Sequence, residues 1–250
     1  MKSYVMTDVG KKRASNQDAF CQGRLNSDVQ FLVVCDGMGG HRGGNVASEI
    51  AVRGFYELLT HRLTPSVRTK ELKSILSDVI ARVSLLIAQT GAESPEFAGM
   101  GSTVVLAVRL GKKVCIAHVG DSRAYLYRNG TLRRLTKDHS LVQEMIDRGE
   151  ISAEESQKHP RRNVITRTLG YAEDSQPEIV FSDLRSGDLF LLCTDGLTVP
   201  VDDAALSEIL RENPPEHLAS ALISKALEGG GPDNITVGIL YEDETEASLK

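Results

Sequence analysis

Four aspartates of this chain stand where short apolar runs begin or end. Asp36 ends FLVVCDG and Asp195 ends FLLCTDG, whereas Asp121 follows CIAHVG and Asp233 directly precedes NITVGILY. A single aspartate beside glycine or asparagine is most often a turn former. Four such residues, two of them in the same context of an apolar run followed by Asp-Gly, instead predict one shared site, because strand ends can aim side chains at a common point.

Carboxylates gathered in this way predict a site for hard divalent cations. Without cations they would repel one another and raise their pKa values. Oxygen ligands suit Mg²⁺ or Mn²⁺, and histidine or cysteine clusters with zinc spacing are absent from the sequence. Two such ions would lower the pKa of a bridging water and stabilise both the entering and the leaving oxygen at phosphorus. The expected chemistry is therefore phosphate ester hydrolysis by a metal-bound hydroxide.

Two further side chains suit a phosphate substrate. Arg13 precedes Asp18 by five residues in TDVGKKRASNQD, so one loop can carry both into the same pocket, and arginine matches phosphate geometry with paired hydrogen bonds. On spacing alone, a solvated arginine beside Lys11 and Lys12 is an equal alternative. His41, in DGMGGHRGG, suits protonation of a leaving alkoxide because its ordinary pKa is near neutral, and a plain loop histidine is the alternative.

Covalent catalysis is disfavoured by the motifs that are missing. The sequence has no GxSxG nucleophile elbow and no CxxxxxR pattern, and its glycine-rich run lacks the GK[ST] ending of a P-loop. The four cysteines stand far apart with no CxxC pair, and three of them sit inside apolar runs. We therefore expect reduced thiols buried in strands.

Two hydrophobic patterns describe the elements that must position these residues. Short apolar or alternating runs predict strands at residues 3–9, 18–25 and 29–37, four more between 102 and 136 that form an antiparallel meander, and others at 177–182, 188–196 and 234–241. Apolar residues at spacings of three and four predict helices over 44–61 and 72–87, and near 206–210 and 218–227. Strands interleaved with helix pairs favour an α+β fold over a doubly wound sheet.

Length, composition and net charge restrict the class of protein. The chain has 250 residues, 41% of them hydrophobic and 25% charged, which suits one domain over residues 1–241 and a polar tail over 242–250. The net charge of -5 argues against nucleic-acid partners. The N-terminus lacks an apolar leader region, and no run approaches the roughly 18 apolar residues of a membrane span. We expect a cytoplasmic monomer that does not enter a membrane.

Eight motifs in order carry a resemblance to a known family: TDVGKKRASNQD, VCDGMGGH, GSTVVLAV, AHVGDSRAYLYRNG, LTKDHSLV, ITRTLG, LLCTDGL and GGPDNITV. From about Thr7 to Val237 the chain resembles the metal-dependent protein phosphatases (PPM, type 2C) in their compact bacterial form. The resemblance implies a four-layer α-β-β-α sandwich with a metal site between two antiparallel sheets. It also implies two or three Mn²⁺ or Mg²⁺ ions, phosphoserine and phosphothreonine substrates on proteins, and a serine/threonine kinase that the enzyme counteracts.

The resemblance also implies the cation ligands. Asp36 would bridge two metals, with the backbone carbonyl of Gly37 on the first and with Asp195 and Asp233 on the second. Asp121 and Asp195 would hold a third, weaker metal.

Substrate contacts follow from the same resemblance. Arg13 would bind the substrate phosphate, and Asp18 would order a metal-bound water. The stretch over residues 147–167, a polar region in which we expect a surface excursion, matches a flap thought to influence substrate choice, with His159 inside it.

Two departures from the family pattern bear on the chemistry. Gln17 stands where a glutamate is common, which removes one negative charge near the metals, and Met38 stands where animal relatives have histidine. The general acid is therefore left open between His41 and water.

Two other functions compete with a protein phosphatase. One is an inactive regulatory module on the same fold, against which the retained Arg13, Asp36, Asp195 and Asp233 argue. The other is a phosphatase that acts on small metabolites, which only a comparison of substrates can separate.

Overall fold

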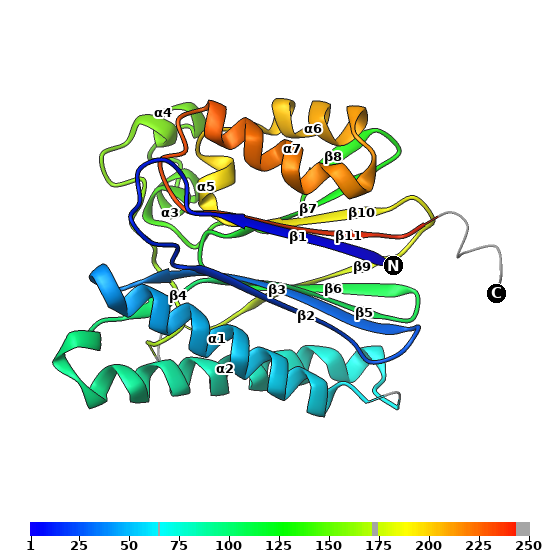
Figure 1. Cartoon of the computed structure of the whole chain (residues 1–250), viewed down its shortest axis with the longest axis horizontal. Helices are drawn as coiled ribbons and strands as arrows, with labels where there is room; N and C mark the ends of the chain where they lie inside the picture. Colours follow the sequence, from blue (N-terminus) through cyan, green and yellow to red (C-terminus); the bar gives the residue numbers. More distant parts are fainter. Residues whose placement is uncertain (65, 172–174, 244–250) are drawn as a thin grey trace.

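Two antiparallel sheets stack face to face, and helices cover the outer face of each sheet (Figure 1). The computed structural model describes residues 1–64, 66–171 and 175–243, with the backbone alone at residue 41. Its layers run helix, sheet, sheet, helix, which confirms the α+β, four-layer α-β-β-α sandwich. Residues 244–250, most of the expected polar tail, lie outside the described part, and the boundary at residue 241 stays a prediction.

The first sheet contains, in spatial order, β1 (Lys2–Asp8), β11 (Ile235–Tyr241), β10 (Leu189–Cys193), β7 (Arg123–Arg128) and β8 (Thr131–Arg134). The second sheet contains β2 (Asp18–Arg24), β3 (Val29–Met38), β5 (Val104–Leu110), β6 (Lys113–Val119) and β9 (Glu178–Asp183), with the short β4 (Gly101–Ser102) paired to β3. The helices are α1 (Gly40–Arg62), α2 (Thr69–Glu93), α3 (Leu141–Asp147), α4 (Ala153–Lys158), α5 (Asp195–Thr198), α6 (Asp203–Glu212) and α7 (Pro215–Glu228), with a 3-10 turn η1 (Pro95–Phe97).

Continuous apolar runs form the central strands because both faces of each strand are buried. In β3, Phe31 and Val33 pack with the residues of α1 and α2, whereas Leu32 and Val34 face the other sheet. β10 divides its side chains in the same way between α6 and α7 on one face and the space between the sheets on the other. A strand buried on both faces loses the alternation of a half-exposed one. Gly238 permits the close approach of the sheets, since a Cβ there would lie 2.7 Å from Leu32 Cδ2.

The two longest helices form one outer layer. α2 buries Leu72, Leu76, Ile80, Val83 and Ile87 in the core that it shares with α1 and β3. Among the described helices, α2 alone is long and apolar enough by composition to cross a membrane. Its buried stripe accounts for that composition as core packing.

α1 begins at Gly40, four residues before the helix expected from the pattern. Glycine has low helix propensity, so the run DGMGGHRGG hides the first turn from sequence analysis. Packing overrides propensity here, because a Cβ on Gly43 would lie only 3.1 Å from Met100 Cβ.

The expected four-stranded meander over 102–136 is wrong. β5 and β6 form a hairpin in one sheet, and β7 and β8 form a hairpin in the other. The hydrophobic pattern is the same in both hairpins, so it could not show that the chain changes sheets between them. The change of sheet places Asp121 at the crossover, between β6 and β7.

The polar stretch over 147–167 contains a short helix that periodicity did not show. Ser152 caps the first turn of α4, and its hydroxyl accepts a hydrogen bond from the backbone N–H of Glu155. No residue of α4 is buried, so capping rather than an apolar face defines this helix. α3, α4 and α5 lie together at one end of the sandwich (left in Figure 1).

Candidate functional site

The predicted aspartates meet where strand ends of the two sheets come together. Asp18 begins β2 and lies directly opposite Asp36 in the register of β2 and β3. Asp18 Oδ2 accepts hydrogen bonds of 2.9 Å from the hydroxyl of Thr194, directly after β10, and of 2.8 Å from that of Thr236, near the start of β11 in the same sheet. Asp195 follows Thr194 directly. The two sheets are therefore joined at this point by a buried carboxylate.

Burial and mutual repulsion raise the pKa values of these carboxyl groups. Burial, followed by the charges of Asp195 and Asp233, raises the pKa of Asp18 to about 7 even though two threonine hydroxyls lower it. Burial and then Asp195 raise the pKa of Asp121 to about 8, and burial and then Asp233 raise the pKa of Asp195 to about 6. Burial raises the pKa of Asp36 well above its usual value, with further contributions from Asp18, Asp195 and Asp121. The site therefore concentrates more negative charge than the protein alone compensates.

Unpaired oxygens show that this ligand set fits divalent cations. Within the described residues, one carboxylate oxygen each of Asp18, Asp121 and Asp195 is buried without a hydrogen-bond partner. Such an unpaired oxygen costs about 1–3 kcal/mol, or more when it is charged, and a divalent cation is a partner that would satisfy all three. In the same part of the chain, no three of these carboxylates bring one oxygen each within 4.8 Å of one another, so three of them could share one ion only after their side chains move closer together.

The backbone around Gly37 is closely packed. A Cβ on Gly37 would lie 2.0 Å from the carbonyl oxygen of Gly44, so only glycine fits there. The N–H of Gly37 donates to the carbonyl of Gln17, and the side-chain amide of Gln17 donates to the carbonyl of Gly40. Four glycines of DGMGGHRGG thus allow close backbone approach, Gly37, Gly39, Gly43 and Gly44, and the role of the Gly37 carbonyl as a metal ligand stays a prediction.

Arg13 lies at the edge of the same site. Its Nη2 is 2.7 Å from Asp233 Oδ2, and about half of its side chain is exposed. The hydrogen bond to Asp233 raises the pKa of Arg13 above its ordinary value, and Asp36 and Asp195 contribute to the same direction. The guanidinium therefore remains charged, and its exposed part can reach a phosphate that enters from solvent.

Asn234 fixes the loop that carries Arg13, and sequence analysis missed it. Its side-chain amide donates to the carbonyls of Val9 and Ser15, and its side-chain oxygen accepts from the N–H of Gln17. Its position directly after Asp233, as the first residue of NITVGILY, was the available signal, because asparagine side chains commonly bond to nearby backbone.

Threonine hydroxyls around the carboxylates were also missed. Thr194 and Thr236 bind Asp18, and Thr103 Oγ1 accepts from the N–H of Asp36 at 3.0 Å while its own N–H donates to the Asp36 carbonyl. Threonine is common in strands for steric reasons. Nothing in its spacing distinguishes these three from the rest.

A large pocket opens beside two of the aspartates. Its volume is about 970 Å³, and Asp121 and Asp195 lie on its wall together with residues of α3 and α4 and of the segment from α5 to α6. Lys158 and Arg162, from the predicted flap, line the same pocket. The flap therefore borders the space next to the carboxylates.

Of the two predicted histidines, only His159 has a side chain among the described residues. The side chain of His41 lies outside the described residues. His159 follows α4, where its Nδ1 accepts from the backbone N–H of Arg161 at 3.2 Å. Among the described contacts, none links His159 to the aspartates.

Comparison with known proteins identifies the family. A profile for protein phosphatase 2C matches residues 10–227. The chain belongs to the protein phosphatase 2C family. It is 38% identical to the serine/threonine phosphatase stp of Listeria monocytogenes serotype 4b, with 98% of each chain covered. Its structure matches the Streptococcus agalactiae serine/threonine phosphatase with a TM-score of 0.89 at 34% identity, over 97% of this chain and 99% of that one.

A third relative bears on the cations. The catalytic domain of the phosphatase PstP in complex with 2 manganese ions matches with a TM-score of 0.82 at 33% identity, over 95% of this chain and 96% of that one. With the unpaired carboxylate oxygens, this comparison supports divalent-metal dependence of the present phosphatase.

We expect the metal-free phosphatase to lose stability as pH rises. A carboxyl whose pKa is higher in the folded state than in the unfolded state stabilises the fold as long as it is protonated. This stabilisation is complete below the unfolded pKa of about 4. It is lost as pH rises through the folded pKa values of about 6, 7 and 8 for Asp195, Asp18 and Asp121. In EDTA the melting temperature, followed by circular dichroism, should be lower at about pH 8.5 than at about pH 5.5. Mn²⁺ should raise it more at the higher pH. Asp121→Asn should flatten the EDTA profile, and a wild-type profile that rises with pH would contradict the explanation.

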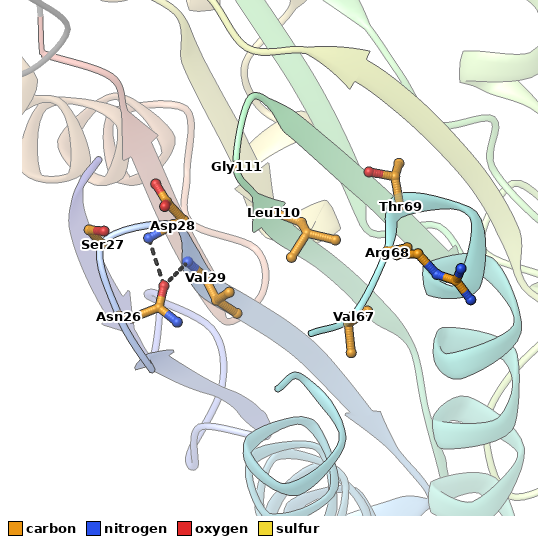
Figure 2. Close-up of a pocket in the computed structure, with 9 residues that line it drawn as sticks. All are labelled: Asn26, Ser27, Asp28, Val29, Val67, Arg68, Thr69, Leu110 and Gly111. Atoms are coloured by element: carbon orange, nitrogen blue, oxygen red, sulfur yellow. Dashed lines mark hydrogen bonds between the residues drawn. The ribbon is translucent and has the colours of Figure 1, made fainter. Parts of the chain in front are cut away.

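A second pocket lies away from the aspartates. It has a volume of about 500 Å³ and is lined by residues 26–29, 67–69 and 110–111 (Figure 2). Val29 begins β3 and Asp36 lies near the other end of that strand, so the pocket is at the opposite end of the sandwich. The Asn26 side-chain oxygen accepts from the N–H groups of Asp28 and Val29, which is a local turn. This pocket gathers no comparable set of carboxylates.

Proposed function

We propose that this phosphatase hydrolyses phosphoserine and phosphothreonine on other proteins, using two or three Mn²⁺ or Mg²⁺ ions. The observation that carries the proposal is the meeting of buried carboxylates from both sheets, with one oxygen each of Asp18, Asp121 and Asp195 unpaired. The names of the relatives, which are serine/threonine phosphatases, support the substrate class.

The proposed ligands divide among the cations as follows. Asp36 and the Gly37 carbonyl would hold the first ion, and Asp36 with Asp195 and Asp233 would hold the second. Asp121 and Asp195 would hold a third. When bound, these ions supply an activated water and neutralise charge on the phosphate.

The remaining residues orient the reactants. Arg13 binds the phosphate oxygens through its exposed guanidinium face, which holds phosphorus in line for attack. Asp18, fixed by Thr194 and Thr236, accepts a hydrogen bond from the attacking water and so directs it. The leaving alkoxide takes its proton from His41 or from water.

The cellular setting is part of the proposal. A serine/threonine kinase is the expected opponent, the enzyme acts as a monomer, and it works in the cytoplasm. Size-exclusion chromatography with light scattering checks the monomer, and cell fractionation checks the location.

Metal removal and thiol modification test the reaction class together. Burial raises the pKa of Cys21, Cys115 and Cys193 to about 12, so none of them is a reactive thiolate at neutral pH. EDTA should abolish hydrolysis of p-nitrophenyl phosphate, Mn²⁺ should restore it, and iodoacetamide should leave it unchanged. Inactivation by iodoacetamide would indicate a cysteine mechanism instead.

A substrate panel separates the competing functions. We expect phosphothreonine and phosphoserine peptides to be hydrolysed with higher kcat/KM than sugar phosphates. Preference for sugar phosphates would favour a metabolite phosphatase, and no turnover of any substrate with Mn²⁺ would favour an inactive module.

A further inference from the structure

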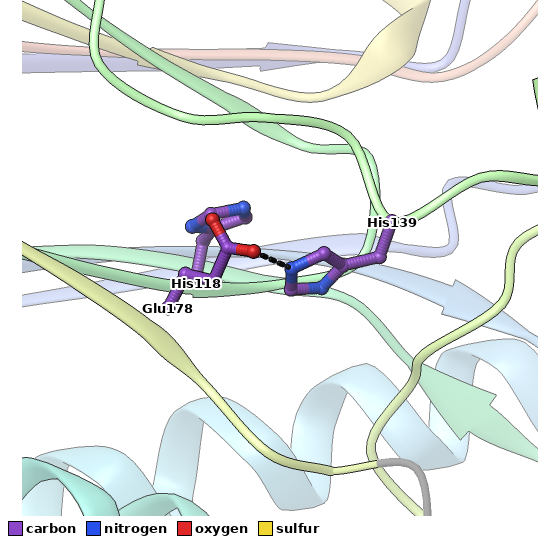
Figure 3. A group of neighbouring side chains, drawn as sticks. All are labelled: His118, His139 and Glu178. Atoms are coloured by element: carbon purple, nitrogen blue, oxygen red, sulfur yellow. Dashed lines mark ion pairs between the residues drawn. The ribbon is translucent and has the colours of Figure 1, made fainter. Parts of the chain in front are cut away.

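A second group of titratable side chains lies beside the crossover that carries Asp121. His118 of β6, His139 of the loop before α3 and Glu178 of β9 offer ligand atoms within 4.8 Å of one another (Figure 3). Both histidines are buried, and their rings stack with centroids 4.6 Å apart and planes 21° apart. No role in the proposed reaction uses them.

Hydrogen bonding argues against a metal ion at this group. The N–H of Gly120 donates to His139 Nδ1 at 3.2 Å, so that nitrogen presents its lone pair to the backbone. In the neutral ring the proton is then on Nε2, which faces Glu178 Oε1 at 3.4 Å without hydrogen-bond geometry. A protonated Nε2 cannot bind a cation. Metal–imidazole bonds also lie in the ring plane, and two stacked rings do not aim their lone pairs at one point.

His139 instead holds Gly120 from two directions. Besides the bond to Nδ1, the backbone N–H of His139 donates to the carbonyl of Gly120 at 2.9 Å. Gly120 has φ +109, and a Cβ there would lie 2.6 Å from Thr103 Cγ2, so the peptide is confined between Thr103 and His139. The next residue is Asp121.

The other side of Asp121 is fixed by a separate set of bonds. Thr103 Oγ1 lies 2.8 Å from the hydroxyl of Ser122, and the same Oγ1 accepts from the N–H of Asp36. Asp121 is thus held on both sides, through Gly120 by His139 and through Ser122 by Thr103. The carbonyl of His139 also accepts from the N–H of Thr166, which belongs to the predicted flap.

We propose that His139 is a positioning residue for Asp121: its Nδ1 accepts the Gly120 N–H and so directs the Asp121 carboxylate toward Asp195, where the two hold a cation. The inference rests on the proposed role of Asp121 as a ligand. Removing a residue that orients a metal ligand commonly weakens the affinity for the metal about ten- to hundredfold. Burial, followed by His118 and Arg167, lowers the pKa of His139 to about 4, so the ring is neutral at neutral pH. Nδ1 therefore keeps the lone pair that accepts the Gly120 N–H.

Two substitutions separate the nitrogens of the ring. In His139→Asn the side-chain oxygen takes the place of Nδ1 and can still accept from Gly120. In His139→Gln the amide nitrogen takes the place of Nε2, and the acceptor for Gly120 is lost. Mn²⁺ is titrated calorimetrically into the metal-stripped wild type and into both variants, with Asp121→Ala as the reference for a lost ligand.

The expected result is a difference between the two variants. His139→Gln should weaken the weakest Mn²⁺ step about ten- to hundredfold, toward Asp121→Ala, and His139→Asn should stay within about threefold of wild type. Equal losses in both variants, or none in either, would overturn the positioning role. If Asp121→Ala itself leaves every Mn²⁺ step unchanged, the proposed ligand assignment fails instead. Stoichiometric Zn²⁺ binding that His118→Ala abolishes would replace the inference by a metal site.

The hydrogen-exchange rate of the Gly120 amide is a second measurement, and it does not require metal. The Gly120 N–H should exchange faster in metal-stripped His139→Gln than in wild type, and at the wild-type rate in His139→Asn. Identical rates in all three proteins would contradict the bond to Nδ1 as a restraint on Gly120.

Discussion

Replacing Asp36 by asparagine should nearly abolish turnover while the fold stays intact. Asp36 lies in β3 opposite Asp18, and the charges of Asp18, Asp195 and Asp121 all act on it. Under the proposed assignment it is shared by two cations, so one substitution weakens both. Loss of several kcal/mol, at 1.36 kcal/mol per factor of ten, corresponds to about a thousandfold or more in kcat. Initial rates on a phosphothreonine peptide with saturating Mn²⁺ measure the loss.

A control on a distant helix separates this effect from a general change of charge. Asp78 in α2 pairs with the half-buried Arg62 and the exposed Arg82, and Asp78→Asn should change neither rate nor Mn²⁺ affinity, because this surface network lies on the outer helix layer and such pairs contribute little. Asparagine at residue 36 removes repulsion among buried carboxyls, so the metal-free variant should melt at or above the wild-type temperature. An Asp36→Asn protein that keeps full turnover and its Mn²⁺ affinity would refute the site assignment.

The sequence predicted which aspartates come close together better than it predicted the path of the chain between the sheets. Asp36 and Asp195 were detectable because each directly or nearly follows the apolar run of a strand buried on both faces, β3 and β10. The change of sheet between β6 and β7 was not detectable, because alternation reports which faces are buried and not which neighbour covers them. Asp121 therefore reached the site by a route that the predicted meander does not contain.

The residues that hold the carboxylates were the least predictable part. Thr194 and Thr236 reach Asp18 only because β10 and β11 are antiparallel neighbours, so that the end of β10 lies beside the start of β11. The hydrogen bonds between His139 and Gly120 connect residues of two loops, and loops have no sequence periodicity from which such contacts could be predicted. Such contacts follow from tertiary structure, so local pattern carries no information about them.

Replacing Arg13 by alanine should lower kcat/KM about 10- to 150-fold, mainly through KM. The expected loss is about 1.5–3 kcal/mol, the range for hydrogen bonds to a charged group, at 1.36 kcal/mol per factor of ten. The kcat/KM of Arg13→Lys should fall between those of the wild type and Arg13→Ala, since lysine keeps the positive charge but lacks the planar guanidinium that binds two phosphate oxygens. Steady-state kinetics on a phosphothreonine peptide measure both parameters, and Arg82→Ala on α2 serves as the control.

The ion pair of Arg13 with Asp233 makes a second explanation testable in the same variant. If Arg13 acted only by holding Asp233 in place, Arg13→Ala would weaken Mn²⁺ binding and lower kcat, with KM unchanged at saturating metal. If it binds the substrate phosphate, Mn²⁺ affinity should not weaken, because a cation that competes for the Asp233 carboxylate has been removed. Calorimetric titration of Mn²⁺ into the variant, beside its KM, therefore decides whether this guanidinium acts on the substrate or on the metal ligand.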